Sequence, residues 1–333
     1  MKNRISYFDI AKGIGIILVM FAHVTLPITL EKFIYSFHVP LFFFLSGYFF
    51  SLKKYDNFKE FLFSKFKRLL TPYIFFSIFN YLFYLVFNQY ANTSLESPIK
   101  PFLGIFLGVR VGEWGLGIAA LWFIQALFIC EIAMYFLIKI TKDNIKWLLF
   151  SLCIFTLLGC LYNMFIGVRL IWSIDVAIMS ILFLGLGYII KRINFINKID
   201  SHILLIIFLC INLFMGLSNS KVNMYWGKYG NYLMFYMAAI SGILVVLIIS
   251  RKINKSRILE FIGQNTIIYL GIHQYVIFSV LNKIKNILSL NINNTILIII
   301  AIFYVIFTIV VLYPIIKILN KNFPFIVGKN LKS

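Results

Sequence analysis

Long apolar stretches constrain this chain more than any other feature of its sequence. They recur in lengths of about 18 to 25 residues, enough for helices that cross about 30 Å of hydrocarbon and satisfy their own backbone groups. The predicted fold class is therefore all-α, a polytopic membrane protein with about ten transmembrane helices. We predict these spans at residues 6–26, 33–52, 69–90, 116–138, 147–165, 171–190, 202–218, 231–250, 261–281 and 294–316.

Composition and charge support a membrane location. The chain is 62% hydrophobic and 13% charged, whereas soluble domains are about 45 to 50% apolar and 25% charged. The net charge of +20 does not indicate nucleic acid, because its distribution follows topology. If the N-terminus is cytoplasmic, 22 of the 31 Lys and Arg lie on cytoplasmic segments, eight lie outside and Lys12 lies within the first span. This positive-inside pattern predicts that both termini are cytoplasmic.

The chain shows no fixed-period repeat, and we expect no appended soluble domain. We therefore expect one membrane domain over residues 1–333, in contact with the lipid bilayer. Its chemistry would take place within the membrane or at its edge. Because the cysteines lack metal-ligand spacing, no metal is expected.

Three histidines and one acid are predicted at a similar depth. An ionisable side chain at bilayer depth costs about 2.5 to 3.5 kcal/mol, so each one is a candidate functional residue. At about 1.5 Å per residue, His23 and His38 lie at nearly the same height in the outer half, where they can share a cavity. His273 and Asp175 reach a comparable depth and are supporting candidates. The alternative is structural: a histidine that bonds a carbonyl of a neighbouring helix, or an acid at a helix start.

Basic residues gather at the predicted cytoplasmic end. Lys12 lies 11 residues before His23, about 16 Å lower on the same helix. Such bases can bind an anion, or they can snorkel to the headgroups and set topology. Glu131, in the cytoplasmic half of the fourth span, is expected to pair with a base or to line a cavity. Three further bases stand in the stretch "FSKFKRLL" before the third span: Lys65, Lys67 and Arg68.

Several segments resemble one family in order and spacing: "YFDIAKGIGIILVMFAH", "IYSFHVPLFFFLSGYFF", "KFKRLLTPY", "LWFIQALF", "FLGLGYIIKR" and "FIGQNTIIYLGIHQYVI". The chain is similar over nearly its whole length to the acyltransferase-3 family of bacterial membrane acyltransferases. The family's first-helix pattern of a base, ten residues and a histidine resembles Lys12 to His23. Its Arg-x-x-Arg motif resembles Lys65-x-x-Arg68. Lysine at position 65 keeps the charge but lacks the planar fork of arginine.

The resemblance implies transfer of an acetyl, or a succinyl, group from cytoplasmic acyl-CoA to sugars of surface glycans or their lipid-linked intermediates. It also implies a place in the bacterial cytoplasmic membrane, beside polysaccharide biosynthesis machinery. A sugar hydroxyl needs a positioned base, and the pKa of histidine suits that role. His23 is the predicted base, with His38 as its partner, orienting group or acyl carrier. Acetyl-CoA is the predicted donor, held by a set of bases: Lys12, Lys65, Lys67 and Arg68.

Two other classes of function remain open. In an exporter or flippase of a polysaccharide or lipid-linked sugar, the histidines would bind cargo or relay protons. The sequence shows no internal repeat and no paired broken helices of the kind that many transporters have. An assembly subunit without chemistry would give the matched histidines no role. The acyltransferase hypothesis uses both the histidines and the bases.

Overall fold

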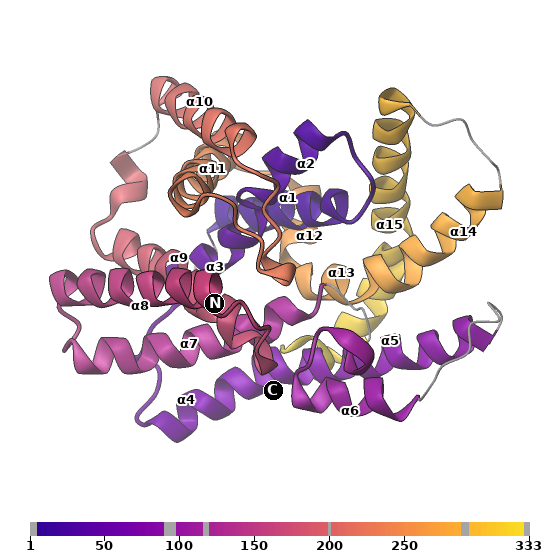
Figure 1. Ribbon diagram of the computed structural model, residues 1–333, viewed down its shortest axis with the longest axis horizontal. Helices are drawn as coiled ribbons and strands as arrows, with labels where there is room; N and C mark the ends of the chain where they lie inside the picture. The colour runs from indigo at the N-terminus through magenta and orange to yellow at the C-terminus, as the bar shows by residue number, and fades with distance from the viewer. Residues whose placement is uncertain (1–4, 90–97, 116–119, 199–200, 288–292, 330–333) are drawn as a thin grey trace.

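The computed structural model describes residues 5–89, 98–115, 120–198, 201–287 and 293–329 (Figure 1). Over these ranges the chain is almost entirely helical and contains no strand, only an isolated bridge between Asn223 and Lys228. The α-helices are α1 (Ser6–Ala22), α2 (Ile28–Tyr35), α3 (His38–Phe49), α4 (Phe58–Lys65), α5 (Thr71–Gln89), α6 (Ile99–Leu107), α7 (Trp122–Ile140), α8 (Ile145–Phe165), α9 (Ile174–Arg192), α10 (His202–Ser218), α11 (Tyr232–Ile253), α12 (Arg257–Gln264), α13 (Thr266–Ile272), α14 (Ser279–Ile287) and α15 (Asn294–Asn322).

Shorter helical pieces connect or extend them. Two have π-helical hydrogen bonding, η1 (Phe66–Leu70) and η6 (His273–Phe278). The others are 3₁₀ turns: η2 (Gly112–Trp114), η3 (Ile171–Ser173), η4 (Phe195–Lys198), η5 (Met224–Trp226) and η7 (Pro324–Val327).

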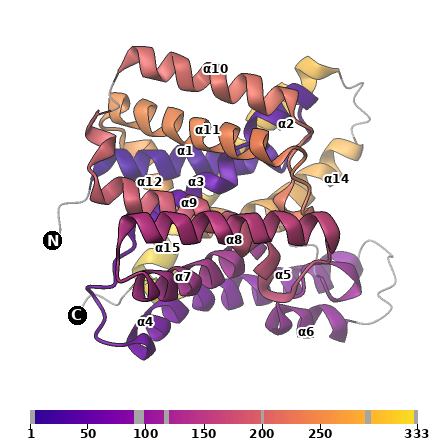
Figure 2. The ribbon, with the colours of Figure 1, turned by 60° about the vertical axis from the view of Figure 1, so that its left-hand side comes forward.

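The predicted all-α polytopic architecture is confirmed. Among the described residues, eight helical stretches are long and apolar enough to cross a membrane. The other two predicted spans correspond to α1 and α10, each 17 residues long, at the short end of the range for a spanning helix. Predicted span ends at residue 90 and at residues 116–119 lie outside the described residues, as do both chain termini. The start of α1 and the end of α15 lie at the same end of the bundle (Figure 2).

The second predicted span is not the continuous helix that was expected. α2 ends at Tyr35, Phe37 has non-helical dihedrals (φ −144°, ψ −15°), and α3 begins at His38. Pro40 explains the break, because it has no N–H to donate to the carbonyl of Ser36 four residues earlier, and its ring would clash there. The break places the His38 imidazole at the start of a helix instead of inside one.

The ninth predicted span, residues 261–281, is also interrupted. α12 ends at Gln264, and Asn265 lies outside helical geometry (φ −125°, ψ 22°) before α13 begins. The Asn265 side-chain amide donates to the carbonyl of Phe261 (2.7 Å), a local bond that replaces a backbone one. A π-helical turn then begins at His273. Such turns are frequent at functional sites.

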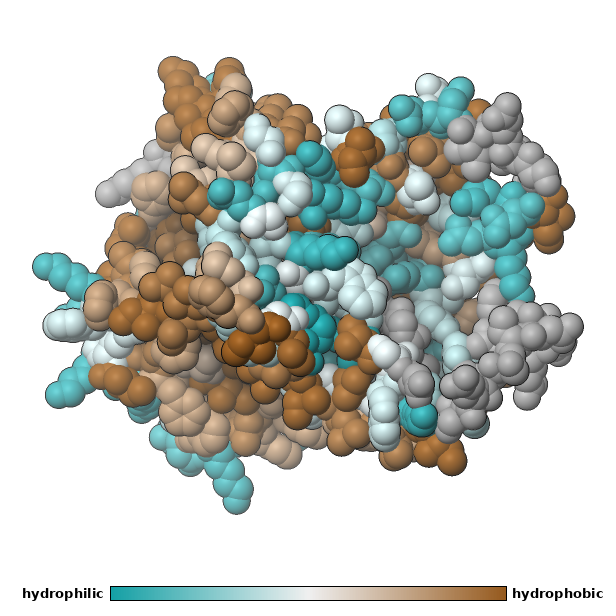
Figure 3. Space-filling model, viewed as in Figure 1, coloured by the Kyte–Doolittle hydropathy of each residue, from teal (hydrophilic) through white to brown (hydrophobic). Residues whose placement is uncertain are grey.

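Close helix packing holds α3, which carries His38, against α9. A Cβ added to Gly47 of α3 would lie 1.8 Å from the carbonyl oxygen of Leu184, and one added to Gly187 of α9 would lie 2.0 Å from that of Phe44. Small residues of this kind let helix backbones approach closely within a membrane. Polar residues gather near the centre of the face in Figure 3, and apolar ones cover its left side and lower edge.

Candidate functional site

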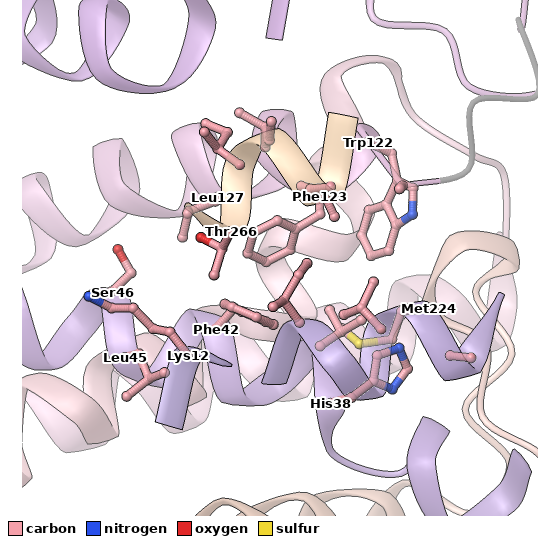
Figure 4. Close-up of a pocket in the computed structure, with 18 of the residues that line it drawn as sticks. Lys12, His38, Phe42, Leu45, Ser46, Trp122, Phe123, Leu127, Met224 and Thr266 are labelled. Carbon is pink, nitrogen blue, oxygen red and sulfur yellow. The ribbon is translucent and has the colours of Figure 1, made fainter. Parts of the chain in front are cut away.

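A large cavity of about 1150 Å³ is lined by residues from many elements, among them α1, α2, α3, η1, α7, α12, α13, the segment before α11 and the segment after α15. Figure 4 shows Lys12 and Ser46 at one end of it and His38 at the other. Apolar side chains line the stretch between these ends, among them Phe42, Phe123 and Leu127. The cavity therefore has two polar ends and an apolar middle.

His23 and His273 are neighbours at one end. His23 caps the C-terminus of α1 and lines the cavity. The ring centroid of His273 lies 5.1 Å from that of His23, and His273 is completely buried. Its Nδ1 lies 2.7 Å from the carbonyl oxygen of Tyr269, so Nδ1 carries the proton and Nε2 the lone pair. Nε2 is buried and has no hydrogen-bond partner among the described residues.

His38 lines the same end of the cavity. Its Nδ1 donates to the carbonyl oxygen of Ile34 (2.7 Å), a bond that spans the break between α2 and α3. Its ring meets the ring of Tyr35 edge-on, with centroids 5.1 Å apart, and the Tyr35 hydroxyl donates to the carbonyl of Ala22 (2.7 Å). His38 thus has a fixed tautomer with the lone pair on Nε2, and a chain of contacts joins it to the end of α1 beside His23.

Three of the four bases predicted to hold the donor line the opposite end: Lys12, Lys65 and Arg68. Lys12 lies 3.4 Å from the Asp9 carboxylate. Arg68 is exposed and makes no ion pair among the described residues. Lys67 is exposed, its ammonium lies over the Phe63 ring, and it does not line the cavity.

Lys65 is not exposed at this end of the cavity, because its side chain is buried in an ion pair. Its ammonium lies 2.9 Å from the Glu131 carboxylate, and the two side chains are 8% and 5% exposed. The other carboxylate oxygen of Glu131 accepts from the Ser46 hydroxyl (2.6 Å). Glu131 thus pairs with a base, and it also lines the cavity.

Asp175 pairs with two arginines and does not line the cavity. Its carboxylate takes a bidentate bond from Arg110 (2.6 and 3.0 Å) and a third bond from Arg169 (3.1 Å). Arg110 lines the cavity, whereas Asp175 does not. Depth along the membrane placed Asp175 level with the histidines, but depth says nothing about lateral position or about partners distant in sequence.

Comparison with known proteins identifies the family. The sequence model of the acyltransferase domain family (Acyl_transf_3) matches residues 5–316, nearly the whole chain. The chain belongs to the acyltransferase-3 family. No curated protein and no solved structure matches it. This acyltransferase is thus a multi-pass membrane protein whose general activity is acyl transfer.

The histidine end of the acyltransferase is bordered by a cross-link that the sequence did not reveal. Glu31 of α2 and Lys221, in the segment between α10 and α11, form an ion pair (2.5 Å), and both line the cavity. Nearby, Trp122, Tyr225 and Trp226 also line it. Burial raises the pKa of the Tyr225 phenol, although the Arg110 guanidinium acts in the opposite direction. The Tyr225 hydroxyl donates to the backbone carbonyl of Arg110.

The arrangement provides imidazole lone pairs at one end of the acyltransferase cavity and positive charge at the other. It therefore suits proton transfer at one end and anion binding at the other. Among the described residues there is no group of three or more His, Cys, Asp and Glu side chains that could hold a metal ion.

Proposed function

We propose that this acyltransferase moves an acetyl group, with succinyl as the alternative, from cytoplasmic acyl-CoA to a sugar hydroxyl. The acceptor is a cell-surface glycan or its lipid-linked intermediate, and the reaction is an O-acylation in the bacterial cytoplasmic membrane. One observation carries the proposal: α1 contributes both Lys12 and His23 to a single cavity. A donor bound at the basic end can thereby reach the histidines.

The donor side follows from charge and polarity. Coenzyme A carries several phosphate charges at one end and a thioester at the end of a long flexible arm. Arg68 suits the phosphates because charge-assisted bonds to phosphate are the stronger class of hydrogen bond. Phe42, Phe123 and Leu127 provide an apolar wall for the arm. We place the basic end on the cytoplasmic side, in line with the excess of Lys and Arg on the predicted cytoplasmic segments.

His23 is the proposed general base. It takes the proton of the sugar hydroxyl while the hydroxyl oxygen attacks the thioester carbonyl carbon. The C–O bond forms, the C–S bond breaks, and the coenzyme A thiolate takes up the proton from His23. The products are the sugar ester and free thiol, with no co-reactant. Base catalysis of this kind contributes typically 10²- to 10⁴-fold.

The other two histidines support this step in different ways. The ring of His273 lies beside that of His23, and its Nε2 has no hydrogen-bond partner among the described residues. This nitrogen can accept an N–H from the His23 ring and so orient it. His38 presents Nε2 at the same end of the cavity and can hold the acceptor hydroxyl or act beside His23. Fixed tautomers at both positions mean that neither ring needs to reorganise before proton transfer.

The exporter hypothesis loses one argument against it. The sequence showed no paired broken helices, but the structure contains breaks between α2 and α3 and between α12 and α13. The sequence did not reveal these breaks, because Pro40 and Asn265 interrupt the helices without interrupting the apolar stretches of sequence around them. The family match over residues 5–316 favours acyl transfer over export.

The test uses purified protein in detergent with radiolabelled acetyl-CoA and a panel of sugars and glycan fragments. We expect label to pass to a sugar with the parent. His23→Ala should lose at least about 100-fold in turnover, because the base is gone. It should still bind acetyl-CoA, since the phosphates bind at the other end of the cavity.

The matched control is His202→Ala. His202 begins α10 and does not line the cavity. This variant should keep parental turnover. Undiminished transfer by His23→Ala would refute the proposed base. Absence of label transfer to every sugar, with sugar export lost in a deletion strain, would favour the exporter.

A further inference from the structure

The histidine end of the cavity has an aromatic wall that proton transfer does not use. Three rings in contact form it: the centroid of Tyr225 lies 6.3 Å from that of Trp122 and 4.8 Å from that of Trp226. All three residues line the cavity, and Figure 4 shows Trp122 at the same end as His38. Trp122 and Tyr225 are buried, whereas Trp226 is 52% exposed. The accessible part of the aromatic wall is therefore mainly the Trp226 side chain.

Hydrogen bonds and a buried ion pair hold the aromatic wall in place. The Tyr225 hydroxyl donates to the Arg110 carbonyl, and the Arg110 guanidinium donates to the Tyr225 carbonyl (3.0 Å). The same guanidinium is anchored by the Asp175 carboxylate (2.6 and 3.0 Å). The backbone N–H of Trp226 donates to the side-chain oxygen of Asn223 (3.3 Å), which closes the turn. The rings are thus positioned before a ligand binds, which lowers the entropic cost of binding.

Groups that can bond hydroxyls lie at the same end. Glu31 and Lys221 form an ion pair (2.5 Å), and both line the cavity. The pair uses one carboxylate oxygen of Glu31, and the other lies 3.5 Å from the backbone N of Leu26, a long and weak contact. The Lys221 ammonium has three donors and lies 4.7 Å from the centroid of the Tyr35 ring, which packs against His38. Both charged groups therefore keep hydrogen-bonding capacity close to an imidazole.

This combination matches the surface of a neutral sugar. A pyranose has a face of C–H bonds that packs on an aromatic ring, and a rim of hydroxyls that a few well-placed polar groups can bind. Lys221 and Arg110, which line this end, are each paired with a carboxylate, so an anionic sugar would gain little from them. His38 lines the same end, so one rim hydroxyl can lie at an imidazole while the ring face is held.

We propose that a neutral pyranose ring of the acceptor stacks on Trp226, in the aromatic wall that Trp122 and Tyr225 complete, while Glu31 and Lys221 bind its hydroxyls. Trp226 is then a specificity-determining residue for the acceptor and takes no part in donor binding. This inference rests on the proposed function in one respect, the use of a sugar hydroxyl as acceptor.

The test is acetyl transfer from saturating acetyl-CoA to the methyl β-glycosides of glucose, galactose and N-acetylglucosamine. Trp226→Ala should raise the KM for the labelled glycoside about tenfold with little change in kcat, because stacking holds the ground state and the transition state alike. Trp226→Phe should keep most of the parental KM, because it keeps a ring, whereas Trp226→Leu should resemble the alanine variant. Binding of acetyl-CoA should be parental in all three. Trp147→Ala, at an exposed position of α8 that does not line the cavity, is the matched control and should keep the parental KM.

The outcomes separate this inference from the proposed function. A parental KM in Trp226→Ala would overturn the stacking site and leave acyl transfer to sugars intact. Equal losses in Trp226→Phe and Trp226→Leu, with lowered thermal stability in both, would make Trp226 an interfacial anchor and would also overturn it. Preference of the parent for methyl β-glucuronide over the glucoside would refute the neutral class. If the parent acetylates no sugar at all, the proposed function fails, and this inference fails with it.

Discussion

Removing one charge of the Lys65–Glu131 pair should destabilise the protein more than removing both. The ammonium and carboxylate lie 2.9 Å apart, and the side chains are 8% and 5% exposed. Loss of one partner from a buried pair costs about 3 to 5 kcal/mol, because the other charge remains buried without compensation. Replacing both partners by neutral groups of similar size is often close to neutral. We therefore expect that the losses in unfolding free energy from substituting Lys65 and from substituting Glu131 do not add when both residues are replaced.

The surroundings of each charge predict which single variant is worse. In Glu131→Gln, the Lys65 ammonium still lies 5.1 and 5.4 Å from the ring centroids of Phe50 and Phe61. Cation–π attraction of about 0.5 to 2 kcal/mol offsets part of the loss, so we expect a cost of about 3 kcal/mol. In Lys65→Met, the Ser46 hydroxyl is the one hydrogen-bond partner that the described residues leave to the carboxylate, and the cost should approach about 4 to 5 kcal/mol.

The assay is reversible unfolding in mixed micelles of mild detergent and SDS, followed by circular dichroism. The parent, both single variants and Lys65→Met/Glu131→Gln complete a double-mutant cycle. Lys67→Met is the control, because Lys67 is exposed two residues away on the same helical stretch. It should change stability by less than about 0.5 kcal/mol. Single costs below about 1 kcal/mol, or costs that add in the double variant, would refute the reasoning.

Four further results are expected from the same purified protein or from cells. Arg68→Ala should weaken acetyl-CoA binding by roughly 10-fold or more and leave stability nearly unchanged, because an exposed residue buries little surface; parental affinity would mean that Arg68 serves topology only. His273→Ala should lower kcat with little change in KM, whereas His273→Gln, which keeps an acceptor, should recover part of kcat; equal loss in both would indicate packing. His38→Gln should lower turnover, and near-parental turnover would leave His38 a role in helix contacts alone. In a cysteine-free background, a cysteine at Ser220 should react with an impermeant reagent outside sealed cells and one at Lys53 should not; labelling of position 53 would reverse the orientation.

The spans were predictable because hydropathy and length suffice to identify them, whereas the helix breaks were not. Pro40 and Asn265 interrupt helices inside stretches that stay apolar on both sides, so a hydropathy average does not detect them. Pro40 was nevertheless a usable signal. A proline in a helix interior cannot donate a hydrogen bond to the carbonyl four residues earlier, which for Pro40 is that of Ser36. Asn265 gave no comparable signal, because its bond to the Phe261 carbonyl depends on one side-chain rotamer.

Height in the membrane was predictable for the candidate site, but lateral neighbours were not. The rise per residue placed His23 and His38 at one level, and both line the cavity. The same argument put Asp175 at their depth; its carboxylate is bound by Arg110, 65 residues away in sequence, and it does not line the cavity. The contact between His23 and His273 spans 250 residues, and which helices meet across the bundle is not encoded in periodicity.

Lys12 and His23 lie near opposite ends of α1, and their fixed separation accounts for a cavity with a basic end and a histidine end. Lys12 and His23 are separated by 11 residues of one rigid helix, about 16 Å, so their spacing does not depend on loop motion. Under the proposed function, a donor held by its phosphates near Lys12 and Arg68 would extend its arm past apolar side chains before the thioester meets an imidazole. An apolar stretch of that kind excludes water from the thioester, which limits hydrolysis while the acceptor is absent. Bases without carboxylate partners at the histidine end would instead attract the phosphates to the wrong place and oppose proton uptake by the imidazoles through like-charge repulsion. The cations that line the cavity near the histidines are paired with carboxylates, Lys221 with Glu31 and Arg110 with Asp175. Under the proposed function, the donor phosphates are therefore directed to the end where Arg68 lies.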